Sequence, residues 1–453
     1  MDSYEDAIRW LYDRIDYERI GPSGQTNPFR LERVERLLAL IGSPQERIPA
    51  IHIAGTKGKG STAAMIESIL RTAGVQTGLF TSPHIEQFEE RMRVSGRMPG
   101  PDQFARLVRR LREVLEDAEM DRSDRIPTFF EVSTILAWML FDEENVSLAV
   151  LETGMGGRLD CTNVCRPLVT VITSIGLDHT HILGDTLSRI ATEKAGIIKP
   201  GVPVIQGQLP GDADLVVEAR AREMQATRFV CGREFAWLQE PPSASDNGRQ
   251  QRVTVITPRS RYDRLTLPLL GQHQAHNASL AVMAVELLTD QGGPVVPSTA
   301  IESGLQDVSW PLRFEVFDGT PTIILDAAHN PDSMRAVADT LTADEWQKRK
   351  RVLVFAASAD KDAAAMLRYI LPHFDDIVFT RFLGNPRSLP PENLCDLART
   401  TNLVDSARLH VTQSPADALE FARHLAGAAG LVCATGSLFL AAEIRGLLAA
   451  SAR

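Results

Sequence analysis

The sequence predicts an α/β protein in which helices cover both faces of a doubly wound, mostly parallel β-sheet. Short apolar runs alternate with helical patterns along most of the 453 residues, and a glycine-rich turn joins an early run to a helix. Strands that are apolar on both faces and separated by helices are typical of buried parallel sheets. The chain is too long for one compact core, so two domains are expected.

The first series of elements contains five candidate strands, each followed by a turn or a helical pattern. The candidate strands are "AIHIA" (50–54), "TGLFT" (77–81), "SLAVLE" (147–152), "LVTVIT" (168–173) and "VPVIQG" (202–207). A helix is predicted from Ser61 to Ala73, with Gly74 closing it, because glycine is favoured just past a helix end. The polar, turn-rich segment 240–251 is predicted to be an exposed loop.

A second series of strands, loops and helices begins near residues 306–317. Its strand-like runs lie in "PTIILDAAHNP", "KRVLVFAASADKD", "DDIVFTRF" and "GLVCATGSLFL". We therefore predict a larger N-terminal domain over residues 1–308, P-loop ATPase-like and doubly wound. A smaller Rossmann-like α/β domain is predicted over residues 309–453.

Composition narrows the classes of function. Hydrophobic residues make up 44% and charged residues 23% of the chain, as in ordinary globular proteins. The sequence contains no apolar run long enough to cross a membrane, and its first residues are acidic, unlike a signal peptide. The net charge of −10 argues against a broad nucleic-acid surface, although local cations can still bind small anions. We expect small-molecule substrates and neither a nucleic-acid nor a membrane partner.

Five cysteines are scattered along the chain, and only Cys161 and Cys165 lie close together in sequence. No CxxC pair accompanies them. The preferred interpretation is five reduced thiols in a cytoplasmic protein, with a metal site or a disulfide as the alternative.

The stretch "IHIAGTKGKGSTAAM" (51–65) is interpreted as a phosphate-binding loop of unusual design. It departs from the G-x-x-x-x-G-K-[ST] pattern because Ile53 stands at the first glycine position and Gly60 separates Lys59 from Ser61. An apolar strand precedes it and a helix follows, so backbone N–H groups and the helix N-terminus can hold phosphates that Lys59 reaches. The alternative is a tight strand-to-helix turn. The predicted nucleotide-binding residues here are Gly55, Thr56, Lys57, Gly58, Lys59, Gly60 and Ser61.

Ser82 follows the predicted strand 77–81, Glu152 ends the strand 147–152, and His179 lies just past "LVTVITSIG". In a doubly wound sheet the carboxyl ends of the strands meet at one edge, so these side chains would converge beside the phosphate loop. A hydroxyl, a carboxylate and an imidazole there can hold Mg²⁺ together with ATP phosphates. The alternatives are a turn residue, a surface carboxylate and a core histidine.

The chain resembles the folylpolyglutamate synthase and dihydrofolate synthase family of the Mur ligase superfamily. Its phosphate loop fits the family form G-T-[NK]-G-K-[GT]-[ST], and further motifs follow in the family's order over nearly the whole chain. They are "TSPHIEQFEERMRVSG" (81–96), "LETGMGGRLDCTN" (151–163), "SIGLDHTHILGDT" (174–186), "EKAGIIKP" (193–200), "GQHQAHNA" (271–278), "LRFEVF" (312–317), "LDAAHNPDS" (325–333) and "ATGSLFL" (434–440).

The resemblance implies ATP and Mg²⁺, with one metal ion on Ser82, Glu152 and His179. It implies a second ion near Lys194, which family members carry as a carbamylated lysine; an ordinary solvated helix lysine is the alternative. Lys59, Lys194 and His329 are the implied catalytic residues.

Further nucleotide contacts are implied for Asn277, Arg313 and Asp326. The position before Arg313 is usually glycine in the family, but here it is Leu312.

On the acceptor side the resemblance implies contacts from Pro83, His84, Leu159 and Asp160. Phe129 or Phe130, in "PTFFEVST" (127–134), could stack on a flat heterocycle, or both could be core residues. Cys161 replaces the family's alanine after "RLD", a small change for packing.

The implied reaction joins L-glutamate to a folate through an acyl phosphate, in a monomeric enzyme. The acceptor is a reduced folate, dihydropteroate or both. Two alternatives remain: a Mur-type ligase that acts on a cell-wall precursor, and a non-catalytic ATP-binding regulator. Release of phosphate from ATP only with folate and glutamate would separate them.

Overall fold

The computed structural model of the chain describes residues 3–14, 31–117, 127–240, 248–342, 346 and 348–451. The chain packs into two compact units. The first comprises Met1–Leu238, Val253–Thr266 and His276–Val308, and the second comprises Gln239–Arg252, Leu267–Ala275 and Ser309–Arg453.

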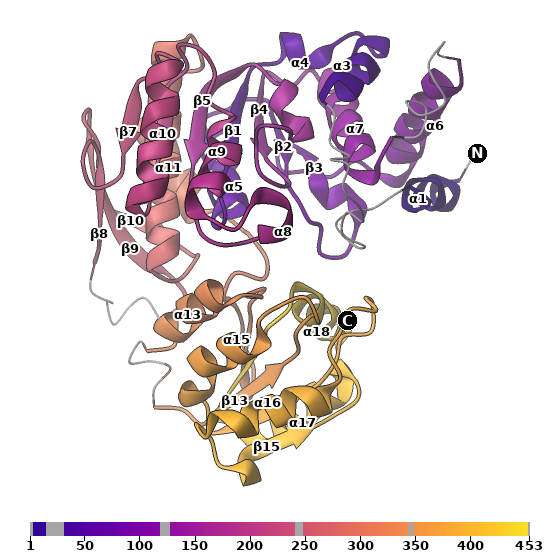
Figure 1. Cartoon of the computed structure of the whole chain (residues 1–453), viewed down its shortest axis with the longest axis vertical. Helices are drawn as coiled ribbons and strands as arrows, with labels where there is room; N and C mark the ends of the chain where they lie inside the picture. The colour runs from indigo at the N-terminus through magenta and orange to yellow at the C-terminus, as the bar shows by residue number, and fades with distance from the viewer. Residues whose placement is uncertain are drawn as a thin grey trace. The chain divides into compact units, whose positions relative to one another are not determined.

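The first unit is built on a seven-stranded sheet with the order β3-β2-β4-β1-β5-β6-β7 (Figure 1). Its strands are β1 Ala50–Ala54, β2 Thr77–Phe80, β3 Met92–Val94, β4 Leu148–Glu152, β5 Pro167–Ile172, β6 Val204–Gln206 and β7 Arg228–Val230. All neighbouring strands run parallel except β2 and β3 at the edge. Each of the five predicted apolar runs overlaps one strand, and the ends differ by no more than two residues. The predicted fold class is confirmed.

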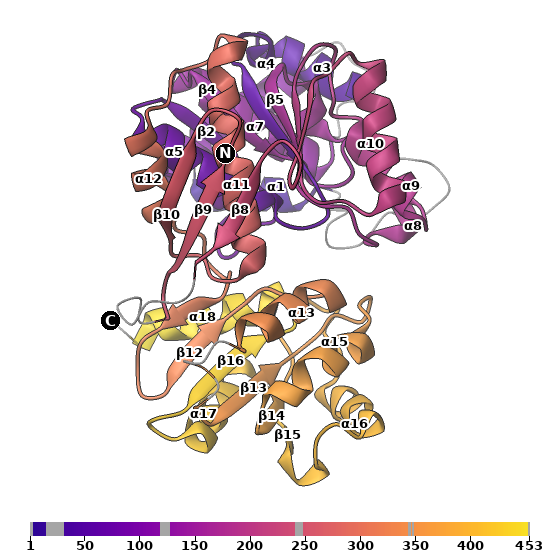
Figure 2. The same ribbon diagram turned by 90° about the vertical axis from the view of Figure 1, so that its left-hand side faces the viewer.

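Helices lie on both faces of this sheet (Figure 2). They are α1 Tyr4–Tyr12, α3 Leu31–Leu40, α4 Pro44–Arg47, α5 Lys59–Thr72, α6 Pro101–Asp117, α7 Phe129–Glu143, α8 Thr180–Leu183, α9 Leu187–Ala195, α10 Gly211–Glu223, α11 Gln272–Leu288 and α12 Ser298–Gln306. Two short 3₁₀ turns matter for the site, η1 Phe88–Arg91 and η2 Cys161–Val164. Helix α5 packs on β2, β4 and α12, whereas α9 and α10 share a core with β5 and β6.

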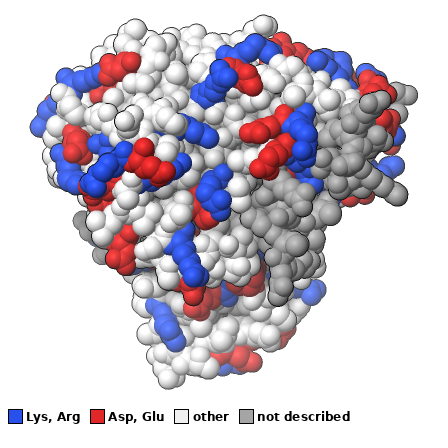
Figure 3. All heavy atoms as spheres, turned by 45° about the horizontal axis from the view of Figure 1, so that its top comes forward, with Lys and Arg blue, Asp and Glu red and all other residues white. Residues whose placement is uncertain are grey.

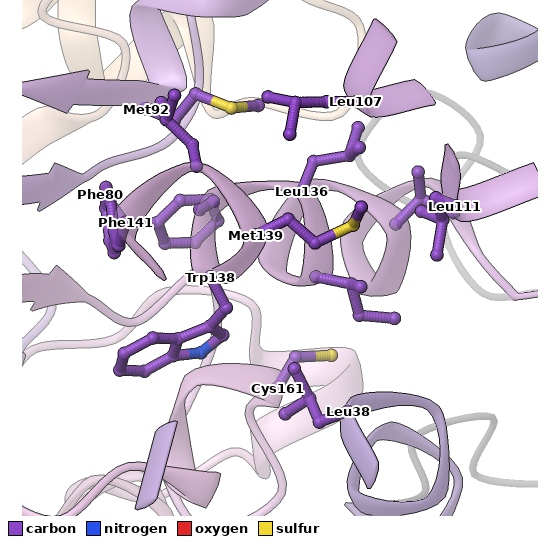
Figure 4. Packing of buried hydrophobic residues seen from close by; sticks show 14 of the residues in the cluster. Leu38, Phe80, Met92, Leu107, Leu111, Leu136, Trp138, Met139, Phe141 and Cys161 are labelled. Atoms are coloured by element: carbon purple, nitrogen blue, oxygen red, sulfur yellow. The ribbon is translucent and has the colours of Figure 1, made fainter. Parts of the chain in front are cut away.

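Helix α7 contributes many buried side chains to a hydrophobic core cluster that also includes residues of β1–β4. Figure 4 shows Trp138 and Phe141 on this helix, with Phe80, Met92 and Leu107 beside it. Cys161 lies in the same cluster with 7% of its surface exposed, so the thiol is accommodated where the family's alanine was expected. Burial raises the pKa of the Cys161 thiol well above its ordinary value. An uncharged thiol is compatible with this core.

The second unit contains a six-stranded sheet with the order β11-β12-β16-β13-β14-β15. Its strands are β11 Glu315–Phe317, β12 Thr322–Leu325, β13 Arg351–Phe355, β14 Asp376–Phe379, β15 Leu409–Val411 and β16 Leu431–Thr435. Only β11 runs antiparallel to its neighbour. The flanking helices are α13 Pro331–Thr340, α15 Ala363–Ile370, α16 Pro391–Thr401, α17 Pro415–Ala426 and α18 Leu438–Ser451.

A three-stranded sheet of β8 Ala236–Gln239, β9 Gln251–Ile256 and β10 Arg261–Leu267 follows β7 in the chain (Figure 2). The predicted loop 240–251 lies between β8 and β9, and its residues 241–247 are outside the described part of the chain. The prediction is wrong at its last residue. Gln251 begins β9 and is buried. Its side-chain amide can be buried because it donates to the carbonyls of Leu269 and Gly271.

Surface charge is mixed on the face drawn in Figure 3, where lysine and arginine alternate with aspartate and glutamate. Among the described residues, none of the helices is both long and apolar enough to cross a membrane. All five cysteines are free thiols and buried.

Candidate functional site

The glycine-rich loop joins β1 directly to α5, as its strand–turn–helix context predicted. Gly58 occupies the N-cap of α5 with φ of +83°, a left-handed conformation that favours glycine. A Cβ there would lie 2.4 Å from Asn277 Oδ1, and a Cβ at Gly55 would lie 1.9 Å from Thr173 Oγ1. Both positions therefore exclude larger side chains. The turn exposes backbone N–H groups at the positive end of a helix, which is the usual basis of phosphate binding.

The loop is braced by the segment that follows β5. The Thr56 N–H donates to the Ser174 carbonyl at 2.8 Å, and the Lys57 N–H donates to Ser174 Oγ at 2.8 Å. The Lys57 ammonium forms an ion pair with Asp178 at 2.8 Å. Sequence reasoning grouped Lys57 with the nucleotide contacts and missed Asp178, although Asp178 precedes His179 in a quoted motif. These contacts hold the loop in one conformation before any ligand binds.

Glu152 meets Lys59 and the start of the 82–84 segment at the ends of β4 and β2. Lys59 Nζ lies 3.8 Å from Glu152 Oε1, and the Ser82 N–H donates to Glu152 Oε2 at 3.3 Å. The side chains of Lys59 and Glu152 are 16% and 6% exposed. The carboxylate is thus placed beside the phosphate loop, where the convergence of strand ends predicted it.

His179 caps the short helix α8 in a left-handed conformation with φ of +50°. Its Nε2 lies 3.9 Å from Asp178 Oδ1. The same Asp178 carboxylate forms the ion pair with Lys57 of the phosphate loop. The described residues contain no cluster of three or more His, Cys, Asp and Glu side chains arranged to hold a metal. The predicted set includes only two residues of these types, with the Ser82 hydroxyl as the third. The Glu152 carboxylate beside the phosphate loop is a hard oxygen ligand that suits Mg²⁺, and the Ser82 backbone N–H is bonded to it.

Lys194 is buried at the end of α9, with 4% of its surface exposed. Its Nζ donates to the Gly55 carbonyl at 2.8 Å, so the side chain reaches the first glycine of the phosphate loop. Burial, together with the nearby positive charge of Lys59, lowers the pKa of Lys194 to about 7. This is not the ordinary solvated lysine that sequence alone favoured.

The side chains expected on the acceptor side differ in accessibility. Phe129 is 1% exposed, stacks on Tyr12 at 5.6 Å between ring centroids, and lies under the Arg91 guanidinium at 5.0 Å. Phe130 is only partly buried, and a Cβ at Gly154 would lie 2.5 Å from its ring. Phe129 is therefore part of the core, while Phe130 covers the glycine-rich turn after Glu152.

The remaining acceptor residues occupy two loops. His84 Nδ1 accepts from Arg91 Nε at 2.8 Å, while Pro83 is exposed. Leu159 is half-buried, and Asp160 is 5% exposed. The Asp160 carboxylate accepts N–H groups from Met155 and Thr162, each at 3.0 Å, so it is used within the protein.

The second unit carries Arg313, Asp326 and His329 near the start of its sheet. Asp326 is buried, and its carboxylate accepts the N–H groups of Phe314 at 2.8 Å and Ala328 at 2.7 Å. Burial raises the pKa of Asp326, and the positive charge of Arg313 opposes this. His329 Nδ1 lies 2.9 Å from the Ala327 carbonyl oxygen.

Leu312 adopts the left-handed conformation with φ of +58°, and its side chain is fully buried. The backbone shape that the family usually assigns to glycine is therefore kept, at a cost of about 1–2 kcal/mol for a residue with a Cβ. The buried leucine side chain offsets this cost, since its burial contributes about 1.5–3 kcal/mol.

Comparison with known proteins agrees with this arrangement. The Mur ligase middle domain matches residues 53–285, and the Mur ligase glutamate ligase domain matches residues 312–438. The dihydrofolate synthase/folylpolyglutamate synthase of Bacillus subtilis is 34% identical over 448 residues, covering 98% of each chain.

Solved structures show the same fold. The Mycobacterium tuberculosis folylpolyglutamate synthase complexed with ADP superposes with a TM-score of 0.87 at 32% identity, covering 98% of each chain. A folylpolyglutamate synthase complex with AMPPCP and folate has a TM-score of 0.80 at 29% identity, covering 98% of this chain and 99% of that one.

A phosphate loop on a doubly wound sheet, followed by a glutamate ligase domain, defines a Mur-type ATP-dependent ligase. Within that class, similarity over nearly the full length is to enzymes that act on folates. The chain belongs to the folylpolyglutamate synthase/dihydrofolate synthase family.

Proposed function

We propose that this protein uses ATP to attach L-glutamate to a folate. The observation that carries the proposal is the buried Glu152 carboxylate 3.8 Å from Lys59 Nζ at a preformed phosphate loop. This arrangement occurs in a chain similar over 98% of its length to dihydrofolate synthase/folylpolyglutamate synthase. The acceptor is a reduced folate, dihydropteroate or both. Residues 1–308 would bind ATP and the folate, and residues 309–453 would form the glutamate-ligase domain.

The proposed reaction has two steps. First, the γ-phosphoryl group moves from ATP to the folate carboxylate, so the bond to the β,γ-bridging oxygen breaks and ADP and an acyl phosphate form. The α-amine of L-glutamate then attacks the acyl carbon. An amide bond forms, phosphate leaves, and the amine loses a proton. In such reactions the protein acts mainly by positioning and by neutralising charge.

The residues of the first unit divide these tasks. Gly55–Ser61 would form the loop around the phosphates and hold them through backbone N–H groups other than those of Thr56 and Lys57, which donate to Ser174. Lys59 would neutralise charge on the transferred group. Ser82, Glu152 and His179 would hold Mg²⁺, which would offset the negative charge of the phosphates when bound. The roles of Arg313, Asp326 and His329 at the nucleotide, and of Asn277 at the adenine, stay predictions.

Lys194 is proposed to be carbamylated and to help hold a second Mg²⁺. Carbamylation needs a neutral amine, and the depressed pKa of about 7 leaves a substantial neutral fraction at physiological pH. The neutral amine attacks CO₂, forming an N–C bond and releasing one proton. Intact mass measured with and without bicarbonate would detect the adduct.

Two further expectations concern the protein in solution. We propose that it acts as a monomer, which light scattering during size-exclusion chromatography would test. Its five buried free thiols are compatible with a reducing compartment such as the cytoplasm.

The experiment that tests the function is phosphate release from ATP with each substrate omitted in turn. Release should require both a folate acceptor and L-glutamate, and labelled glutamate should enter the folate product. Parallel assays with dihydropteroate and tetrahydrofolate would identify the acceptor. Phosphate release that is indifferent to both substrates, with no labelled folate, would contradict the proposal.

A further inference from the structure

His52 is a buried histidine on β1, three residues before the phosphate loop, and the reaction scheme above leaves it without a role. Its exposed surface is 0%. The side chain shares one face of β1 with Ala50, which packs in the core around α7. His52 Nε2 lies 2.8 Å from Thr162 Oγ1 on η2.

The hydrogen bond between Thr162 and Asp160 determines which partner donates in the bond between His52 and Thr162. The Thr162 hydroxyl donates its only proton to Asp160 Oδ1 at 2.6 Å, a short bond typical of a carboxylate acceptor. Thr162 Oγ1 must therefore accept from His52, so the proton of the imidazole is on Nε2.

The surroundings of the other ring nitrogen, Nδ1, indicate that the imidazole is neutral. His52 Nδ1 is buried and has no hydrogen-bond partner among the described residues. A protonated ring would place a second N–H there without an acceptor. Burial, together with the positive charge of Lys199, lowers the pKa of His52 to about 3.

Asp160 connects these hydrogen bonds, from His52 to Thr162 and from Thr162 to Asp160, to the turn after β4. Its Oδ2 accepts the Met155 N–H at 3.0 Å, and its Oδ1 also accepts the Thr162 N–H. The turn begins two residues after Glu152 and presses Gly154 against Phe130. A change in the direction of the Asp160 carboxylate would move this turn.

We infer that His52 is a positioning residue that sets the turn at Gly154–Met155 through Thr162 and Asp160. This inference rests on the proposed function, because the turn lies between Glu152 and the predicted acceptor residue Phe130. A leucine of similar size would fill the same core space, but it would leave Thr162 Oγ1 without its donor. The imidazole therefore fixes the geometry of the acceptor side, and the phosphate loop is held by other contacts.

Two amide variants form a matched pair for testing this. The His52→Gln amide nitrogen reaches the place of Nε2 and can donate to Thr162, whereas the shorter His52→Asn side chain reaches only the place of Nδ1. We expect kcat/KM for the folate acceptor to fall about tenfold in His52→Asn, because misplacement of a bound group is costly. His52→Gln should retain it within about threefold. The KM for ATP should change by less than about twofold in both.

Hydrogen exchange gives a readout that does not depend on activity. Exchange of the Met155 amide should accelerate in His52→Asn and in Thr162→Val, and should stay slow in His52→Gln. Val169→Ala controls for general loss of stability, because Val169 is a buried core residue on β5 that takes no part in the hydrogen bonds from His52 to Asp160. It should leave Met155 exchange and the acceptor KM unchanged at matched temperature below unfolding.

The outcomes separate two failures. If the wild-type protein ligates no glutamate, the proposed function fails, and the exchange data still decide the role of His52. If His52→Asn matches His52→Gln in both Met155 exchange and acceptor kinetics, His52 is only a core residue and the inference is overturned. Equal losses for ATP and acceptor in both variants would also overturn it.

Discussion

The buried Lys194 makes a quantitative prediction about pH and stability. Its pKa is about 7 in the folded protein, whereas an unfolded lysine has a pKa of about 10.4. Between these values the unfolded chain binds more protons at this side chain than the folded one, so the free energy of unfolding rises with pH. Lys194→Met removes the titrating group and should remove this rise.

The magnitude follows from the two pKa values. Each pH unit inside the window is worth about 1.4 kcal/mol, reduced near pH 7 where the folded side chain is partly protonated. From pH 7.5 to 9.5 the wild type should gain about 2–3 kcal/mol relative to Lys194→Met. Taking the difference between the two proteins cancels every other group that titrates over the same range.

The assay is urea unfolding at both pH values, followed by circular dichroism, with chelator present and bicarbonate absent so that Lys194 stays unmodified. Lys350→Met is a matched control, because the Lys350 side chain is 47% exposed. It should show the wild-type pH dependence. If wild type and Lys194→Met gain the same stability between pH 7.5 and 9.5, Lys194 is an ordinary lysine and the reasoning is refuted.

Three further substitutions probe the site and its support. Glu152→Gln removes a charge without changing shape and should raise the Mg²⁺ concentration for half-maximal activity about tenfold; an unchanged titration would contradict its metal role. Gly58→Ala puts a Cβ in a left-handed position, 2.4 Å from Asn277 Oδ1; it should weaken ADP binding in calorimetry, and wild-type affinity would argue against the loop geometry. Arg33→Met leaves Glu131, only 3% exposed in its side chain, without its cation. It should lower the free energy of unfolding by about 3–5 kcal/mol, and a loss below about 1 kcal/mol would show that the pair is unimportant.

The sequence predicted what depends on periodicity and turn chemistry. "AIHIA" is apolar on both faces because β1 is buried in the middle of a sheet, and the glycines of the next turn predict a strand-to-helix connection. The start of α7 at Phe129 also carries a local sequence signal. Thr128 and Glu131 form a capping box there, with each side chain bonded to the other residue's backbone.

The features that could not be predicted from the sequence depend on contacts between residues far apart in the chain. The Lys57–Asp178 pair spans 121 positions, and no local pattern distinguishes it from two solvated charges. The split between a core Phe129 and a partly buried Phe130 is set by Tyr12 and Gly154, which lie on separate elements. Leu312 was even less predictable, because a left-handed leucine is allowed only where a packed core stabilises it.

The most direct measurement of the central claim is incorporation of labelled L-glutamate into a folate by Lys59→Ala, with Lys350→Ala as the control. If the loop after β1 binds the phosphates that drive ligation, Lys59→Ala should keep the wild-type melting temperature and lose product formation. Lys350→Ala should retain both. A Lys59→Ala protein that ligates glutamate at close to the wild-type rate would contradict the account.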